Sequence, residues 1–286
     1  MQRRIFLAGL GAMTRVAQAA SPFRAVVSFS VLADMLRQVA GDITIVTLVP
    51  PDGDVHVYQP RPGDLRDISD ASLLVQNGLG LEGWMRRLAG AATFRGVSIT
   101  ATDGVMLRHV DGDIDPHAWQ DPRNGVIYVR NIMQGMVKIN PAELGAHRER
   151  AARYTTQIAA VDEWIAAQFA TIPPKDRRII TTHDAFGYYG ARYGIEFLAA
   201  EGISTDSEPS AKSIAALVAQ IKREKIRAVF IENMTDPRLA RMLARESGAI
   251  LGGTVYSDSL SPPRGPAATY LEMLRHITTL FVRAMT

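Results

Sequence analysis

The chain has 286 residues, of which 47% are hydrophobic, and a mean hydropathy of 0.00. This length and balance are typical of a globular protein with up to two domains, each able to bury a core. No apolar run reaches the roughly 20 residues that a membrane-spanning helix needs. Because the sequence contains no cysteine, it excludes disulfides, thiolate metal sites and a lipid on an N-terminal cysteine.

Residues 1–19 have the pattern of an export signal peptide. Arg3 and Arg4 precede a short apolar core, and Ala17-Gln18-Ala19 offers a cleavage site. The paired arginines also match a twin-arginine signal; the general secretory route is the other possibility, and a short amphipathic helix of the mature fold is a further reading. Removal of this segment leaves 29 basic and 29 acidic residues, since it carries three arginines and no acid. We therefore expect a neutral protein that is free in the periplasm after cleavage near Ala19 and does not bind nucleic acid.

Residues 23–139 alternate between strand and helix patterns. Short β-branched or apolar runs predict strands, and apolar side chains at helical spacing predict helices. The expected strands are 25–29, 43–49, 72–75 and 97–100, and the expected helices are 31–40, 65–69, 81–89 and 122–139. We expect a polar loop over 103–113 and a helix cap at Asp121. This alternation predicts an N-terminal α/β lobe.

Residues 140–172 have the pattern of one long helix. Asn140 can cap it, Pro141 fits the first helical position, and Glu143 completes a capping box. Apolar side chains recur at spacings of three, four or seven, and Pro173-Pro174 ends the pattern. Such a helix would be roughly 45 Å long. We expect it to be a linking backbone helix between two lobes, although an ordinary long helix within one domain would have the same pattern.

Residues 175–286 return to the alternation of strand and helix. The expected strands are 178–182, 195–199, 228–231 and 250–255, and the expected helices are 185–193, 211–223, 237–247 and 266–285. Parallel strands need an intervening crossover, usually a helix. The fold class is therefore α/β, with two lobes of parallel sheet flanked by helices and joined by one long helix.

Polar side chains follow several of these strands, where open parallel sheets bind their ligands. Four candidate metal ligands, two from each lobe, lie just after expected strands: His56, His117, His183 and Asp258. Three imidazoles and one carboxylate suit a divalent cation, zinc above all, in roughly tetrahedral geometry. A single loop histidine is commonly a surface or hydrogen-bonded residue, so the prediction depends on all four converging. For His109, His147 and His276 we expect solvent or packing roles.

Four segments resemble the solute-binding receptors of zinc and manganese ABC importers. They read DVHVYQP at 54–60, DPHAWQDP at 115–122, THDAFGYY at 182–189 and YSDSL at 256–260. The sequence EPS at 208–210, ahead of a helix, also matches this family. The resemblance covers nearly the whole mature chain and implies two α/β lobes joined by a rigid helix. It also implies that His56, His117, His183 and Asp258 are the metal ligands.

The third ligand bears on the choice of metal. Family members that prefer manganese tend to carry a glutamate where this chain has His183, and imidazole shifts the preference toward zinc. Many zinc members also have a long loop rich in histidine and aspartate ahead of the Asp-Pro-His motif. Here that segment is only residues 107–114. It is either a solvated acidic turn or a short remnant that gathers metal through His109.

Supporting roles follow from the charge of such a site. Three neutral histidines, one carboxylate and zinc leave a net charge of +1, which neighbouring carboxylates would offset while fixing the imidazole tautomers. Three carboxylates are candidates for this role: Asp115, Glu208 and Glu232. We expect Asp121 and Asp184 to be helix caps, and Trp119 and Tyr188 to pack near the cleft.

These observations predict a periplasmic solute-binding protein that captures zinc between its lobes and delivers it to an ABC permease in the inner membrane. We expect a monomer, loaded directly or by a periplasmic metallochaperone. A manganese or iron receptor of the same type is the alternative. A zinc hydrolase is an alternative of another class, but the sequence has neither a His-Glu-x-x-His helix nor a serine nucleophile elbow. A surface adhesin would need an anchor or span that the sequence does not offer.

Overall fold

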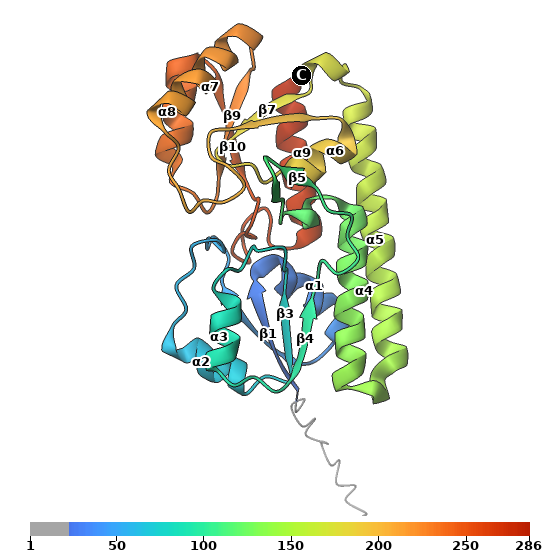
Figure 1. The fold of residues 1–286 in the computed structure, drawn as a ribbon. Helices are drawn as coiled ribbons and strands as arrows, with labels where there is room; N and C mark the ends of the chain where they lie inside the picture. Colours follow the sequence, from blue (N-terminus) through green and yellow to red (C-terminus); the bar gives the residue numbers. More distant parts are fainter. Residues whose placement is uncertain (1–22) are drawn as a thin grey trace, which may run out of the picture.

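The computed structural model describes residues 23–286, which form two four-stranded parallel sheets beside a pair of long helices (Figure 1). The strand order is β2-β1-β3-β4 in the first sheet and β10-β9-β7-β8 in the second. We call the parts built around these sheets the N-terminal lobe and the C-terminal lobe. The signal peptide expected over residues 1–19 lies outside the described residues.

The N-terminal lobe follows the predicted alternation of strands and helices. Its strands are β1 (Arg24–Phe29), β2 (Thr44–Val49), β3 (Leu73–Gln76) and β4 (Val97–Thr100), and its helices are α1 (Ser30–Ala40), α2 (Pro62–Ser69), α3 (Met85–Ala91) and α4 (Pro122–Ile139). Strand β1 is central, and Val26 pairs with Val46 of β2 on one side and Leu74 of β3 on the other. Because parallel sheets are covered on both faces, the apolar run of β1 is fully buried.

The C-terminal lobe has the same construction. Its strands are β7 (Arg178–Thr181), β8 (Glu196–Ala199), β9 (Ala228–Glu232) and β10 (Ile250–Val255), and its helices are α6 (Gly187–Tyr193), α7 (Ala211–Glu224), α8 (Pro237–Ser247) and α9 (Tyr270–Met285). All the strand pairs in this sheet are parallel, as they are in the first. The predicted α/β class with two parallel sheets is therefore confirmed.

The long linking helix is shorter than expected and is preceded by a tight turn. Residues Pro141–Glu143 form a 3₁₀ turn, and α5 then runs over Leu144–Ala170, about 40 Å. The expected capping box at Asn140 is wrong: its side chain makes no capping hydrogen bond, and Asn140 is also the C-terminal cap of α4. Helices α4 and α5 run side by side along the molecule (Figure 1). No helix within residues 23–286 is long and apolar enough to cross a membrane.

One hydrophobic core extends through both lobes. It joins β1, α1 and α4 to α5, α6 and α9, and a smaller cluster fills the space between the C-terminal sheet and helices α7 and α8. The N-terminus of α9 is anchored on the N-terminal lobe, where the buried Asp34 of α1 accepts hydrogen bonds from the Tyr270 N–H and the Tyr154 hydroxyl. The two lobes are therefore packed together and are not connected by α5 alone.

The segment expected to be a polar loop contains a β-hairpin. Strands β5 (His109–Val110) and β6 (Asp113–Ile114) pair antiparallel across a two-residue turn. Asp111 and Gly112 both have positive φ, which the type I′ hairpin turn requires. This hairpin leads directly into the segment that carries His117.

Candidate metal centre

All four predicted ligands lie together between the carboxyl ends of the two sheets. One ligand atom from each of His56, His117, His183 and Asp258 lies within 4.8 Å of the others. Asp258 Oδ2 lies 3.1 Å from His56 Nε2, 3.1 Å from His183 Nε2 and 3.6 Å from His117 Nε2. His117 Nε2 lies 3.3 Å from His56 Nε2. The structure therefore brings together residues that are up to 202 positions apart in the chain.

These separations are those expected around one small divalent cation. Ligands about 2.0–2.1 Å from a tetrahedral metal are roughly 3.3 Å from one another. Asp258 Oδ1 is also buried and has no hydrogen-bond partner among the described residues. Because an unpaired buried carboxylate oxygen is costly unless it faces a cation, the donor set fits a metal ion.

The two histidines of the N-terminal lobe are held by short loops. The His56 N–H donates to Asp54 Oδ1 at 2.9 Å, so the loop after β2 folds into a local turn. Trp84 steadies the same loop by donating from its indole nitrogen to the Val55 carbonyl. His117 lies at the start of a 3₁₀ turn (Ala118–Gln120), ahead of the Asp121 cap of α4, which forms as predicted.

The candidate ligands of the C-terminal lobe also lie at strand ends. His183 comes two residues after β7, and Asp258 comes three residues after β10. The loop that carries Asp258 is held by the N-terminal lobe: Trp119 and Gln120 both donate to the Ser257 carbonyl, and the Leu260 N–H donates to the Ser30 hydroxyl. This loop therefore cannot follow a movement of the C-terminal lobe without breaking these hydrogen bonds.

Two buried carboxylates face the Nδ1 atoms of the candidate ligands His117 and His183. Asp115 Oδ1 lies 2.8 Å from His117 Nδ1, and Glu232 Oε2 lies 2.6 Å from His183 Nδ1. Such contacts fix the tautomer so that Nε2 is free to bind a metal. The third candidate, Glu208, is exposed and lines a separate cavity of about 390 Å³, so its expected supporting role is wrong.

The neighbouring carboxylates raise the pKa of both buried histidines. Burial opposes a charge on His117, but Asp258 and Asp115 raise the pKa of His117 to about 9. Burial also opposes a charge on His183, but Glu232 and Asp258 raise its pKa well above the ordinary value. Burial would raise the pKa of Asp258, but His117 and His183 hold it well below its ordinary range.

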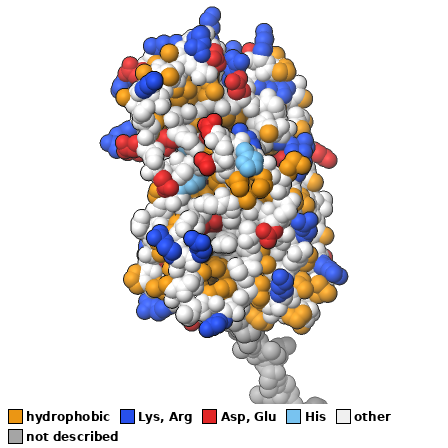
Figure 2. All heavy atoms as spheres, viewed as in Figure 1, with side chains coloured by type: hydrophobic (Ala, Val, Ile, Leu, Met, Phe, Trp, Pro, Cys, Tyr) orange, Lys and Arg blue, Asp and Glu red, His pale blue; other side chains and the backbone are white. Residues whose placement is uncertain are grey.

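His56 lies on the accessible side of the centre. Its side chain is 5% exposed, whereas those of His117, His183 and Asp258 are fully buried. Figure 2 shows acidic side chains and histidine at the level where the two lobes meet. Thr205 of the C-terminal lobe donates to Asp54 across this boundary at 2.7 Å. The loops that carry Asp54 and Thr205 therefore meet beside His56.

The remaining predicted residues have mixed outcomes. Trp119 is buried with its ring centroid 5.3 Å from that of His117, as expected for a residue that packs at the cleft. The expected cap at Asp184 is wrong, because α6 begins three residues later. His109 is exposed on the hairpin, His147 is buried on α5, and His276 bonds to the Thr254 carbonyl.

The sequence predictions missed Arg108, whose guanidinium donates to Asp115 at 2.8 Å. They also missed the Asp54–Thr205 contact between the lobes. The Asp111-Gly112 pair is a hairpin signal that could have placed Arg108 and Asp115 on opposite arms of one turn.

Comparisons with known proteins agree with this arrangement. A family model described as zinc-uptake complex component A, periplasmic, matches residues 25–284. The manganese-binding lipoprotein MntA of Halalkalibacterium halodurans is 32% identical over 98% of this chain and 95% of its own length. The iron-binding protein YfeA of Yersinia pestis is 29% identical over 89% of this chain and 84% of its own length. The structure of the periplasmic zinc-binding protein TroA of Treponema pallidum superposes with a TM-score of 0.89 and 26% identity, covering 92% of this chain and 99% of that one.

Proposed function

Because the chain belongs to the family of periplasmic zinc-uptake complex component A proteins, we propose that it is a receptor that captures zinc between its lobes and delivers it to an ABC importer. The family consists of metal-binding transport receptors and not of enzymes. The metal is the cargo of such a receptor. The question for this chain is which ion it carries and which residues hold it.

One observation carries the proposal: four donor atoms of the right chemistry lie within 4.8 Å of one another between the lobes. His56, His117 and His183 would each bind the ion through Nε2, and Asp258 through its carboxylate. Four protein ligands close a tetrahedral site, whereas a catalytic zinc keeps a position for water. The closed donor set therefore favours capture over hydrolysis.

Zinc is favoured by the ligand types. Imidazole suits zinc and iron, whereas manganese prefers oxygen ligands. The site offers three nitrogen donors and one carboxylate. Asp115 and Glu232 each direct one oxygen to an imidazole, and the other oxygen accepts from Arg108 or from backbone N–H groups. The alternative is a manganese or iron receptor, because the relatives MntA and YfeA are named as manganese-binding and iron-binding proteins. The second oxygen of Asp258 is the feature that would serve a harder ion.

The protein would work in the periplasm, and its partner would be the permease of an ABC importer. The description of the matching family as periplasmic supports this location. We propose that residues 23–139 and 175–286 are the two lobes and that they move little on release. The shared core, the Asp34–Tyr270 contact and the clamped Asp258 loop support small motions. Release would then involve the loops of His56 and Thr205.

Metal analysis tests the proposal. Protein purified without chelator should hold one zinc per chain, and zinc should displace manganese in a competition titration. His117→Ala should lose the ion, whereas His109→Ala on the exposed hairpin should keep it. Preferential retention of manganese or iron would favour the alternative. Retention of zinc by His117→Ala would place the site elsewhere.

A further inference from the structure

Arg108 immediately precedes the β5–β6 hairpin and is separated from the candidate ligand His117 by Asp115. Its side chain is 33% exposed, and its guanidinium donates from Nη1 to Asp115 Oδ2 at 2.8 Å. The backbone fixes this pair from both ends, because the Asp115 N–H donates to the Arg108 carbonyl and the Arg108 N–H donates to the Tyr188 hydroxyl. The arginine is therefore held in place by both lobes.

Asp115 relays the position of Arg108 to a candidate ligand. The carboxylate is fully buried, and its other oxygen, Oδ1, lies 2.8 Å from His117 Nδ1 and accepts from the His117 N–H at 3.0 Å. With one oxygen held by Arg108, the carboxylate plane is fixed and the second oxygen is aimed at the imidazole. The chain Arg108–Asp115–His117 thus ends at the Nε2 atom that faces the other ligands.

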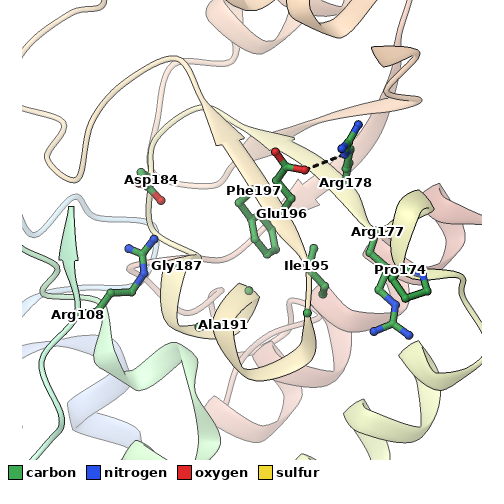
Figure 3. Close-up of a pocket in the computed structure, with 12 residues that line it drawn as sticks. Arg108, Pro174, Arg177, Arg178, Asp184, Gly187, Ala191, Ile195, Glu196 and Phe197 are labelled. Atoms are coloured by element: carbon green, nitrogen blue, oxygen red, sulfur yellow. Dashed lines mark hydrogen bonds and ion pairs between the residues drawn. The ribbon is translucent and has the colours of Figure 1, made fainter. Parts of the chain in front are cut away.

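The guanidinium also rests on the helix that follows the C-terminal ligand His183. A Cβ atom added at Gly187, the first residue of α6, would lie 2.1 Å from Arg108 Nη1 and 2.2 Å from its Cζ. Figure 3 shows Arg108 on the side of the cavity that also carries Asp184 and Gly187. One side chain of the N-terminal lobe therefore lies against the segment that begins with His183.

The cavity of about 550 Å³ beside Arg108 does not offer an anion site of its own. Arg177 donates to the Ile172 and Tyr193 carbonyls, and Arg178 is paired with Glu196 and Glu224. Figure 3 shows these guanidinium groups pointing away from one another. The charge of Arg108 is directed instead to Asp115.

We propose that Arg108 is a positioning residue for the metal centre, which sets metal affinity by holding Asp115 against His117 while seated on Gly187. This inference rests on the proposed function as a metal receptor. Within residues 23–286, no hydrogen bond or ion pair joins Arg108 to a candidate ligand, so it would act through Asp115. The guanidinium of Arg108 occupies the space that a side chain at position 187 would fill.

The first test compares two arginines of similar exposure. Arg108→Gln should weaken zinc binding by about threefold to tenfold, less than the 10–100-fold typical when a direct partner of a metal-bound histidine is removed. Arg192→Gln is the matched control, because Arg192 is 29% exposed and pairs with Asp162 of α5, whose other hydrogen-bond partner is Tyr193 and not a candidate ligand. It should leave the zinc dissociation constant within about twofold of wild type. Competition with a chromophoric chelator measures both.

A second test displaces the guanidinium without removing its charge. Gly187→Ala should weaken zinc binding as Arg108→Gln does, whereas Gly90→Ala, a helical glycine with nothing within 4 Å of the added methyl, should not. Both glycines lie within seven-residue helices, so the control carries the same change of residue type. In the zinc-loaded protein, the ring N–H proton resonance of His117 should shift in Gly187→Ala and Arg108→Gln but not in either control.

A double-mutant cycle decides whether the effect passes through Asp115. In an Asp115→Asn background, Arg108→Gln should add less than about twofold to the loss. Full additivity, or an unchanged or tighter zinc affinity in Arg108→Gln, would overturn the inference. Wild-type protein that binds zinc while Arg108→Gln is unaffected would refute only the role of Arg108. Wild-type protein that binds no metal would refute the proposed function itself.

Discussion

The carboxylate of Glu232 offers the sharpest test of how the centre is built. Glu232 is fully buried at the end of β9, and its Oε2 lies 2.6 Å from His183 Nδ1. Its other oxygen accepts from the N–H groups of Thr182 and His183 at 2.9 and 2.8 Å. Burial would raise the pKa of Glu232, but His183 holds it below its ordinary value. Glu232→Gln keeps the shape and removes the charge.

The expected loss follows from that contact. A carboxylate on the ring N–H of a metal-bound histidine raises the basicity of the ligand and fixes its orientation, and its removal typically costs 10–100-fold in metal affinity. Tenfold to 100-fold corresponds to about 1.4–2.7 kcal/mol. Because the contact is short and fully dry, we expect Glu232→Gln to fall in the upper half of this range.

A second buried glutamate provides the control. Glu82 is also buried, but no ion pair within residues 23–286 involves it. It accepts from the Ser28 hydroxyl and the N–H groups of Asn77 and Gly78, and burial raises its pKa. Glu82→Gln should leave zinc affinity within about threefold of wild type, well below the range for a histidine partner. Chelator competition on both variants gives the two dissociation constants. Equal losses, or no loss in Glu232→Gln, would refute the reasoning.

Three further predictions concern pH and the contact between the lobes. Zinc affinity should weaken as the pH falls below about 9, since zinc must displace the proton that His117 holds with a pKa of about 9; calorimetry in two buffers should detect proton release, and an affinity independent of pH would contradict this. In the metal-free protein, protonated His117 stabilises the fold fully below pH 6.5, the ordinary pKa of histidine, and this contribution is lost as the pH rises through about 9. Urea unfolding below and above this pH range should show the loss of stability, and equal stability on both sides would contradict it. Asp34→Ala should destabilise the protein by about 1–3 kcal/mol, because it leaves the Tyr270 N–H unpaired. Urea unfolding should show a larger loss of stability than in the exposed cap variant Asp236→Ala. Equal losses would contradict a stabilising role for the contact between Asp34 and Tyr270.

Local patterns in the sequence account for most of the fold. The β-branched run that ends at Thr181 predicts β7, and His183 then falls at its carboxyl end, where parallel sheets bind ligands. Asp121 and Pro122 predict the start of α4 from local chemistry alone. The Asp121 side chain accepts from the Arg123 N–H, and a proline at the first helical position has no N–H that would need a partner. These features depend on neighbours within a few residues of one another.

The errors arise where distant parts of the chain decide the outcome. Asparagine is a common helix N-cap, but Asn140 is also the C-terminal cap of α4, so its backbone conformation is constrained by the elements on both sides. Glu208 precedes α7 and Glu232 ends β9, so either could be near the centre by sequence position alone. Only the strand order, in which β9 lies next to β7, places Glu232 beside the candidate ligand His183. The contact of Arg108 with Gly187 joins the two lobes and has no local pattern.

The convergence of four side chains on one ion is the centre of this account. Crystals of zinc-loaded protein, measured on both sides of the zinc absorption edge, test it directly. The account predicts one anomalous peak per chain, about 2.0–2.1 Å from the Nε2 atoms of His56, His117 and His183 and bonded to Asp258. A peak bound by fewer than three of these imidazoles, or one centred on the hairpin at His109, would contradict it.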